Sequence, residues 1–328
     1  EEAVTDGDGG GVDEYFRNSG LVLSADGDSY WAVNGVHPVI SKDYTSYYPK
    51  SVIKASLSDD SIELRCPFYG SSSSSASEFA GSTVSHELDM EALTFGPDAG
   101  ATYMYIGDEY NYIYQMQLAD CTITKQWDLN DIVGDVSGDK GIEALTYSVD
   151  TGYFYAGIQD TSTIHVVSLA DYDSCTDTTD CTVTEVDNWS SVNAPSGMFY
   201  YAVQQVIYVF MGTTTNGAQY LNAYDVDGTV QCELTIPSSF GIARGDGFFI
   251  DENNEYAYIV DSQGPMWDES LGGNLYKVVW DDPCGLGGTG APTTTPAPTP
   301  APAPTAESEN NAATASAPLV ATLVSFGL

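Results

Sequence analysis

The stretch Glu91-Ala92-Leu93-Thr94-Phe95 decides the fold, because the chain repeats its pattern five times. In each copy a small or acidic residue precedes Gly or Ala, then a large apolar residue, then alternating residue types. The other four copies are Ser19-Gly20-Leu21-Val22-Leu23, Glu143-Ala144-Leu145-Thr146-Tyr147, Ser196-Gly197-Met198-Phe199-Tyr200 and Asp246-Gly247-Phe248-Phe249-Ile250. From residue 91 onward the copies recur every 50 to 53 residues. A fixed period of this length is typical of repeat architectures.

Each copy is followed by two further β-rich runs separated by Gly-, Asp- or Asn-rich turns, and four copies by a fourth run. Short antiparallel strands in sets of four predict an all-β fold, a β-propeller of five blades, with six blades as the alternative. Asp281-Asp282-Pro283-Cys284 directly follows the third run of the fifth unit, which therefore lacks its fourth strand. We expect the stretch 14–17 to supply that strand and close the ring.

The charge balance excludes whole classes of partner. Nine Lys and Arg residues against 47 Asp and Glu residues give a net charge of −38. Nucleic-acid binding needs clustered basic residues, and so does adsorption to an anionic lipid surface. We therefore expect no nucleic-acid partner, and membrane contact only through a lipid anchor.

Composition shifts divide the chain into four regions. Residues 1–16 form a flexible acidic N-terminus, 17–284 the propeller, 285–306 a Pro/Thr-rich stalk and 307–328 a tail of small and apolar residues. The stalk favours an extended, O-glycosylated backbone. The apolar tail behind small residues resembles a GPI-attachment signal, although its polar spacer is short.

The six cysteines and one sequon predict an extracellular or cell-surface protein. An even cysteine count without a CxxC pair favours disulfides over a zinc site. We expect Cys175 to pair with Cys181, and Cys66 to pair with Cys284 across the ring closure, with Cys232–Cys284 as the competing pairing. Asn188-Trp189-Ser190 is an N-glycosylation sequon.

The repeat register predicts an acidic central channel. The first strand of each blade lines the axis, so that Glu91, Glu143 and Asp246 occupy equivalent positions. Converging carboxylates resist ionisation unless a cation lies among them, and oxygen ligands suit Ca²⁺. We expect these three acids to hold calcium, with modest support from Ser19 and Ser196. The alternative is that Lys140, Arg244 and water neutralise them and no metal binds.

Further candidates lie on the loops that enter the channel. Channel-lining positions are predicted for Asp89, Asp139, Lys140 and Arg244. His86 is the candidate general base, with Glu87 as its partner or as an alternative activator of water. His165 falls inside a predicted strand and is interpreted as structural.

Residues 86–170 resemble a known family, and 190–280 do so more diffusely. The segments LDMEALTFGPDAGATYMYIGDEYNYIYQMQL and KGIEALTYSVDTGYFYAGIQDTSTIHVVSL are similar to the SdiA-regulated proteins and the neighbouring phytase-like esterase domains. In both segments an acidic-small-apolar run is followed by a turn and a second strand that ends in an acidic residue. The resemblance implies an exported propeller with an acidic channel, and implies no particular activity.

Two functions fit these observations. The first is a non-catalytic surface module that binds an extracellular protein or carbohydrate, which tyrosine-rich exposed rims would contact. The second is a calcium-dependent hydrolase in which the metal polarises an ester or lactone and His86 or Glu87 activates water. Phosphoesters are disfavoured because only Lys140 and Arg244 are placed to bind phosphate. We favour the binding module.

Overall fold

The computed structural model divides the chain into two units, residues 1–288 and 289–328. Within the first unit it describes residues 18–24, 27–34, 50–58, 62–69, 77–79, 82–84, 89–99, 102–134, 136, 140–169, 181–211, 219–236, 242, 245–251, 256–261, 274–280 and 284–286. The predicted strand at 14–17, the stalk beyond residue 286 and the tail lie outside these ranges.

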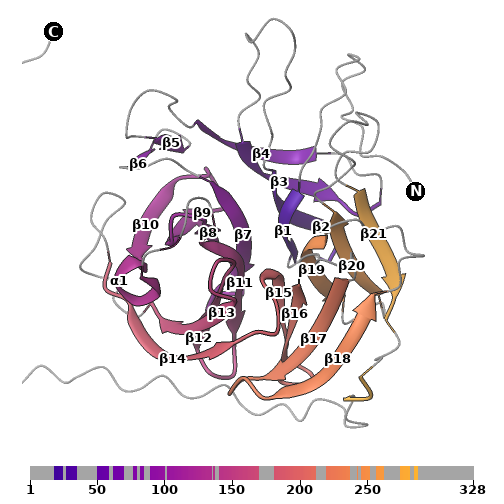
Figure 1. Cartoon of the computed structure of the whole chain (residues 1–328). Helices are drawn as coiled ribbons and strands as arrows, with labels where there is room; N and C mark the ends of the chain where they lie inside the picture. Colours follow the sequence, from indigo (N-terminus) through magenta and orange to yellow (C-terminus); the bar gives the residue numbers. More distant parts are fainter. Residues whose placement is uncertain are drawn as a thin grey trace, which may run out of the picture. The chain divides into compact units, whose positions relative to one another are not determined.

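The described residues form five antiparallel sheets, each a blade of a propeller (Figure 1). Blade 1 contains β1 (Asn18–Leu23), β2 (Ser29–Asn34), β3 (Lys50–Ser56), β4 (Ile62–Tyr69), β5 (Ser77–Phe79) and β6 (Ser82–Val84). Blade 2 contains β7 (Met90–Phe95), β8 (Tyr103–Asp108), β9 (Tyr112–Gln117) and β10 (Ile123–Asp128), and α1 (Asn130–Val133) follows it. Blade 3 contains β11 (Ile142–Ser148), β12 (Tyr153–Ile158), β13 (Thr163–Ser168) and β14 (Thr184–Ser190). Blade 4 contains β15 (Pro195–Tyr201), β16 (Val206–Met211), β17 (Gln219–Asp225) and β18 (Val230–Ile236). Blade 5 contains β19 (Gly245–Asp251), β20 (Tyr256–Asp261) and β21 (Asn274–Val279).

This architecture confirms the prediction of five blades. The innermost strands contact one another in the order β1, β7, β11, β15 and β19, and β19 returns to contact β1. The long spacing between the first two repeats includes the β5–β6 hairpin, which follows the serine run and extends the sheet beyond β4. Every strand that the repeat predicted between residues 18 and 279 is present within a few residues of its expected position.

The hydrophobic core consists of five clusters, one between each pair of neighbouring blades. The cluster that closes the ring joins Leu21, Tyr30 and Ile53 of blade 1 to Phe249 and Val260 of blade 5. Each blade therefore buries apolar side chains on both faces, which explains the density of aromatic and β-branched residues in the strands.

Glycines let the inner strands approach one another closely. A Cβ atom on Gly20, whose φ is +56°, would lie 2.9 Å from the backbone nitrogen of Leu93. A Cβ atom on Gly247 would lie 2.9 Å from the carbonyl carbon of Gly20. The second position of the repeat is therefore small because a neighbouring backbone occupies the space of a side chain.

Candidate functional site

The inner strand of every blade carries a one-residue register shift near its start. The residues without a cross-strand partner are Gly20, Glu91, Glu143, Ser196 and Asp246. In four blades this is the first residue of the sequence repeat. In blade 1 it is Gly20 rather than Ser19, because Gly20 tolerates the left-handed backbone at this point.

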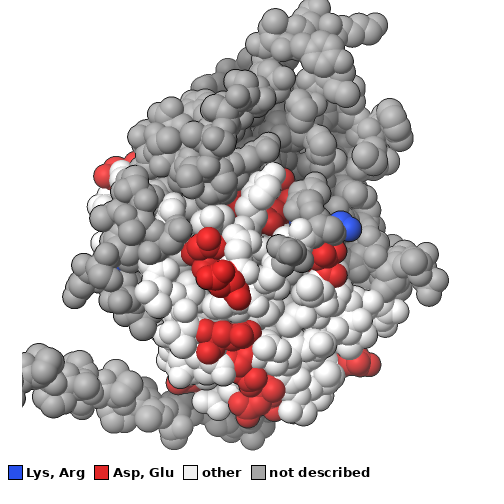
Figure 2. Space-filling model, turned by 60° about the vertical axis from the view of Figure 1, so that its left-hand side comes forward, with Lys and Arg blue, Asp and Glu red and all other residues white. Residues whose placement is uncertain are grey.

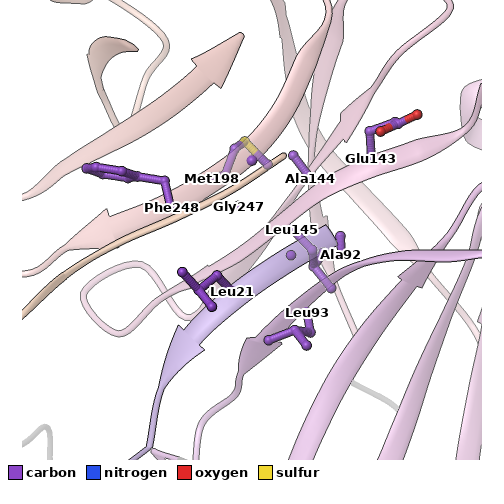
Figure 3. Close-up of a pocket in the computed structure, with 11 residues that line it drawn as sticks. Leu21, Ala92, Leu93, Glu143, Ala144, Leu145, Met198, Gly247 and Phe248 are labelled. Carbon is purple, nitrogen blue, oxygen red and sulfur yellow. The ribbon is translucent and has the colours of Figure 1, made fainter. Parts of the chain in front are cut away.

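Residues at and just after these positions line a narrow space between the five inner strands (Figure 3). Its lining contains one small and one large residue from each inner strand: Gly20, Leu21, Ala92, Leu93, Ala144, Leu145, Gly197, Met198, Gly247 and Phe248. Glu143 is the one carboxylate among the lining residues. Figure 3 shows its carboxylate directed away from Leu21 and Leu93.

This lining is mainly apolar, and it does not test the predicted acidic channel, which stays a prediction. Where the described strands converge, the axis is lined mainly by apolar side chains. Gly20 and Glu143 line the space from unpaired positions, whereas the other nine lining residues follow the unpaired residue of their strand.

The three predicted metal ligands keep equivalent register positions but differ in environment. Glu143 and Asp246 are both 3% exposed, whereas Glu91 is half-buried. The Oε1 atom of Glu143 accepts a hydrogen bond of 2.6 Å from Nε2 of Gln159. Among the described residues, no three His, Cys, Asp or Glu side chains form a group able to hold a metal ion. Calcium binding by these acids therefore remains a prediction.

The two serines of the predicted ring are buried. Oγ of Ser196 donates to the carbonyl oxygen of Gly245 at 2.7 Å, so this hydroxyl links β15 to the start of β19. Nearby, the Gln219 amide accepts from N–H of Gly245 at 3.0 Å and donates to the carbonyl of Ile242 at 2.7 Å. These contacts hold the inner strand of blade 5 against blade 4.

Of the predicted loop residues, the structure describes Asp89 and Lys140. The N–H of Asp89 donates to Oδ2 of Asp108 at 2.8 Å, and the Lys140 side chain is exposed. The other candidates, His86, Glu87, Asp139 and Arg244, lie outside the described residues. The predicted base and its partner therefore have no described geometry.

Sequence reasoning missed the acidic turn between β8 and β9. Asp108 is fully buried and Glu109 is 7% exposed. Oδ1 of Asp108 accepts from N–H of Tyr110 at 2.8 Å, so the two carboxylate oxygens together bind two backbone N–H groups. By register, Glu109 of blade 2 corresponds to Gln159 of blade 3, the residue that hydrogen-bonds Glu143. An alignment of the second strands of the repeats would have placed Glu109 and Gln159 at the same position.

Three buried tyrosines have raised pKa values at the contact between blades 3 and 4. Burial is the main cause for Tyr155, Tyr200 and Tyr224. A short hydrogen bond from the Tyr200 hydroxyl to Oδ2 of Asp150 raises the pKa of Tyr200 further. These phenol groups therefore stay protonated to a higher pH than the side chain of a free tyrosine.

The disulfides overturn one predicted pairing and confirm its competitor. Cys66 pairs with Cys121, and Cys232 pairs with Cys284. The Cys66–Cys284 pairing is wrong because Cys66 belongs to the core cluster between blades 1 and 2, so it faces away from the ring closure. Cys181 is also disulfide-bonded, whereas its predicted partner Cys175 lies outside the described residues.

The remaining predictions concern side chains on the outer strands. Asn188 of the sequon is exposed on β14. His165 lies within β13, as predicted, where its ring is buried and its Nδ1 atom lies 2.8 Å from Oε1 of Glu185. The tyrosines whose burial the structure describes are buried or half-buried, and many of them pack in the clusters between blades. The tyrosine-rich rim stays a prediction.

No family model matches the chain. No curated protein matches it either. Among solved structures, hydrazine synthase of Kuenenia stuttgartiensis is similar at 12% identity and a TM-score of 0.42, covering 75% of this chain and 56% of its own. U3-55K is similar at 13% identity and a TM-score of 0.42, covering 78% and 62%. The β-propeller domain of Cps50 (Swd1) from Myceliophteria thermophila is similar at 10% identity and a TM-score of 0.39, covering 80% and 71%.

This chain therefore spans less than two thirds of the first two proteins. In the described part of the chain, no helix has the length and apolarity needed to cross a membrane.

Proposed function

We propose that this propeller is exported and binds an extracellular protein or carbohydrate at the end of its axis where the inner strands begin. The observation that carries the proposal is the pairing of the buried Glu143 carboxylate with the Gln159 amide at 2.6 Å, beside the bulged positions. Carboxylate and amide groups held on rigid strands suit hydroxyl or ammonium groups of a ligand. A net charge of −38 favours neutral or cationic ligands.

Substitutions at the bulged positions test this proposal. The intact protein is screened against immobilised oligosaccharides and secreted proteins, and each ligand found is retested with Glu143→Gln and Glu91→Gln. We expect both variants to weaken binding. Glu233→Gln is the matched control, because Glu233 is an exposed acid on the outer strand β18. Equal binding by all three variants would place the ligand elsewhere.

Export is supported by the disulfides and by the exposed sequon. After expression through a eukaryotic secretory pathway, peptide-N-glycosidase should lower the apparent mass of the wild type but leave that of Asn188→Gln unchanged.

GPI anchoring of the C-terminal tail is part of the proposal. A GPI-specific phospholipase should then release the protein from cells, and failure of release would remove the anchor from the proposal.

Calcium at the same end of the axis is the second part of the proposal, favoured by the buried carboxylates of Glu143 and Asp246. Millimolar calcium should raise the melting temperature of the wild type. Asp246→Asn should abolish that rise. The resemblance to SdiA-regulated and phytase-like esterase proteins also favours a second proposed function, that of a hydrolase. The protein is tested for hydrolysis of a set of esters and lactones with and without calcium. If calcium does not change the melting temperature and no ester or lactone is hydrolysed, only the proposal of a binding module remains.

A further inference from the structure

The inner strand of blade 5 begins at Gly245, and side chains of blade 4 bind both backbone polar groups of this residue. Its N–H donates to the side-chain oxygen Oε1 of Gln219 at 3.0 Å, and its carbonyl oxygen accepts from Oγ of Ser196 at 2.7 Å. A Cβ atom on Gly245 would overlap the ring of Phe210. Because Gln219, Ser196 and Phe210 are each at most 3% exposed, only a glycine fits between them.

The amide of Gln219 links the two ends of the segment 242–245. While its oxygen accepts from Gly245, its Nε2 donates to the carbonyl oxygen of Ile242 at 2.7 Å. In a hydrogen-bonded β-turn, the carbonyl of the first residue and the N–H of the fourth residue bond each other directly. Here the side-chain amide binds both groups, so the distance between Ile242 and Gly245 depends on a residue of blade 4.

Blades 2 and 3 anchor the equivalent position in a different way. The residue before the unpaired residue is Met90 in blade 2 and Ile142 in blade 3, and both side chains are fully buried in the clusters between blades. In blade 4 this residue is the buried Pro195. Gly245 has no side chain that could pack in this way. In blade 5, hydrogen bonds from blade 4 therefore take the place of an apolar anchor.

We propose that Gln219 is a positioning residue, which fixes the bulged acid Asp246 at the ligand site proposed for the end of the axis. Asp246 directly follows Gly245 and is 3% exposed, so the direction of its carboxylate depends on the backbone that carries it. Gln219 holds that backbone from the neighbouring blade. The part of Asp246 in ligand binding rests on the proposed function, whereas its positioning by Gln219 does not.

The test measures two NMR signals of the intact protein, the hydrogen exchange of the Gly245 amide and the side-chain carboxyl carbon of Asp246. Gln219→Leu keeps a side chain of similar size but removes both hydrogen bonds. We expect the protection of the Gly245 amide to fall at least about tenfold and the Asp246 signal to move. Gln231→Leu is the matched control, because Gln231 is an exposed glutamine on β18 of the same blade. It should change neither signal.

A second variant, Gln219→Glu, separates positioning from general damage to the fold. A protonated carboxyl group can accept from Gly245 and donate to Ile242, as the amide does, whereas a carboxylate cannot donate. We therefore expect Gln219→Glu to resemble Gln219→Leu at neutral pH. At about pH 4, where the carboxyl group is protonated, both signals should return to those of the wild type. The wild type measured at each pH corrects for the titration of the protein's own acids.

The proposal is overturned if Gln219→Leu leaves the Gly245 amide protected, or if the Asp246 signal does not move when protection is lost. A loss of protection spread evenly over blades 4 and 5, or a Gln219→Glu variant that low pH does not restore, also overturns it, because either result indicates a general structural role.

Ligand binding distinguishes this inference from the proposed function. A ligand found at the axis by the screen should bind Gln219→Leu at least about tenfold more weakly than Gln231→Leu, and equal binding would contradict the positioning role. If the screen finds no ligand, the proposed function fails, while the exchange and carboxyl signals still decide the role of Gln219.

Discussion

The contact between blades 1 and 2 and the contact between blades 5 and 1 have the same packing but different chain connections. Both are apolar clusters whose members are almost fully buried. The first is also crossed by the Cys66–Cys121 disulfide. The second joins β1 to β19, from opposite ends of the described chain, with no disulfide between described residues. Among the described residues, the ring closure is therefore held by apolar burial, whereas the contact between blades 1 and 2 is also held covalently.

Phe249→Ala should have the largest effect, because Phe249 is fully buried at the ring closure and stacks on Tyr258 at 4.7 Å. We expect a loss of about 3 to 5 kcal/mol in the free energy of unfolding, measured with denaturant. Hydrogen exchange should rise in β1 and β19 before β7. Phe154→Ala, between blades 2 and 3, is the control. It should be similarly destabilising without selective exchange at the closure. The same exchange pattern in both variants would contradict the comparison.

Replacing Cys66 and Cys121 with alanine should leave the contact between blades 1 and 2 without its disulfide, so that it resembles the contact between blades 5 and 1. The cysteines are 55 residues apart, and a loop of this length corresponds to a loss of about 4 kcal/mol in the chain-entropy model. Denaturant unfolding gives the loss, and hydrogen exchange should now rise in β4 and β9. Alanines at Cys232 and Cys284, which are 52 residues apart, should cost a similar amount while leaving exchange in β4 unchanged. No change in β4 after the first removal would refute the covalent role.

A smaller effect is expected for Tyr200→Phe, which removes the hydrogen bond to Asp150 between blades 3 and 4. We expect a loss of about 1 kcal/mol at neutral pH. Because the pKa of Tyr200 is raised above its ordinary value of 10.0, the unfolded chain loses its tyrosine protons first. The stability of the wild type therefore falls as the pH rises above 10.0, and this fall should be shallower in the variant.

Tyrosinate absorbance and melting temperature as functions of pH check this prediction. Tyr220→Phe is the control, since Tyr220 is half-buried against the same cluster. A variant with the same alkaline loss of stability as the wild type would show that Tyr200 does not contribute to it.

The sequence predicted the strands well because each blade is a local hairpin unit with its own turns. It predicted that the first residues of the five repeats are equivalent, three of them acids. In blades 2 to 5 this first residue is the unpaired residue of the bulge. It did not predict that Gly20 takes this position in blade 1, since that depends on close contact with Leu93 in the next blade. Nor did it predict the apolar lining of the axis, because the orientation of residues after a bulge depends on the local backbone.

The amino-acid sequence alone determined the fivefold repeat and the acidic charge, because periodicity and composition are properties of the chain itself. The tertiary structure decided which side chains line the axis, which of two expected cysteine pairings forms, and which side chains of blade 4 bind Gly245. Each of these depends on which faces of neighbouring blades meet, and that arrangement exists only once the ring has closed.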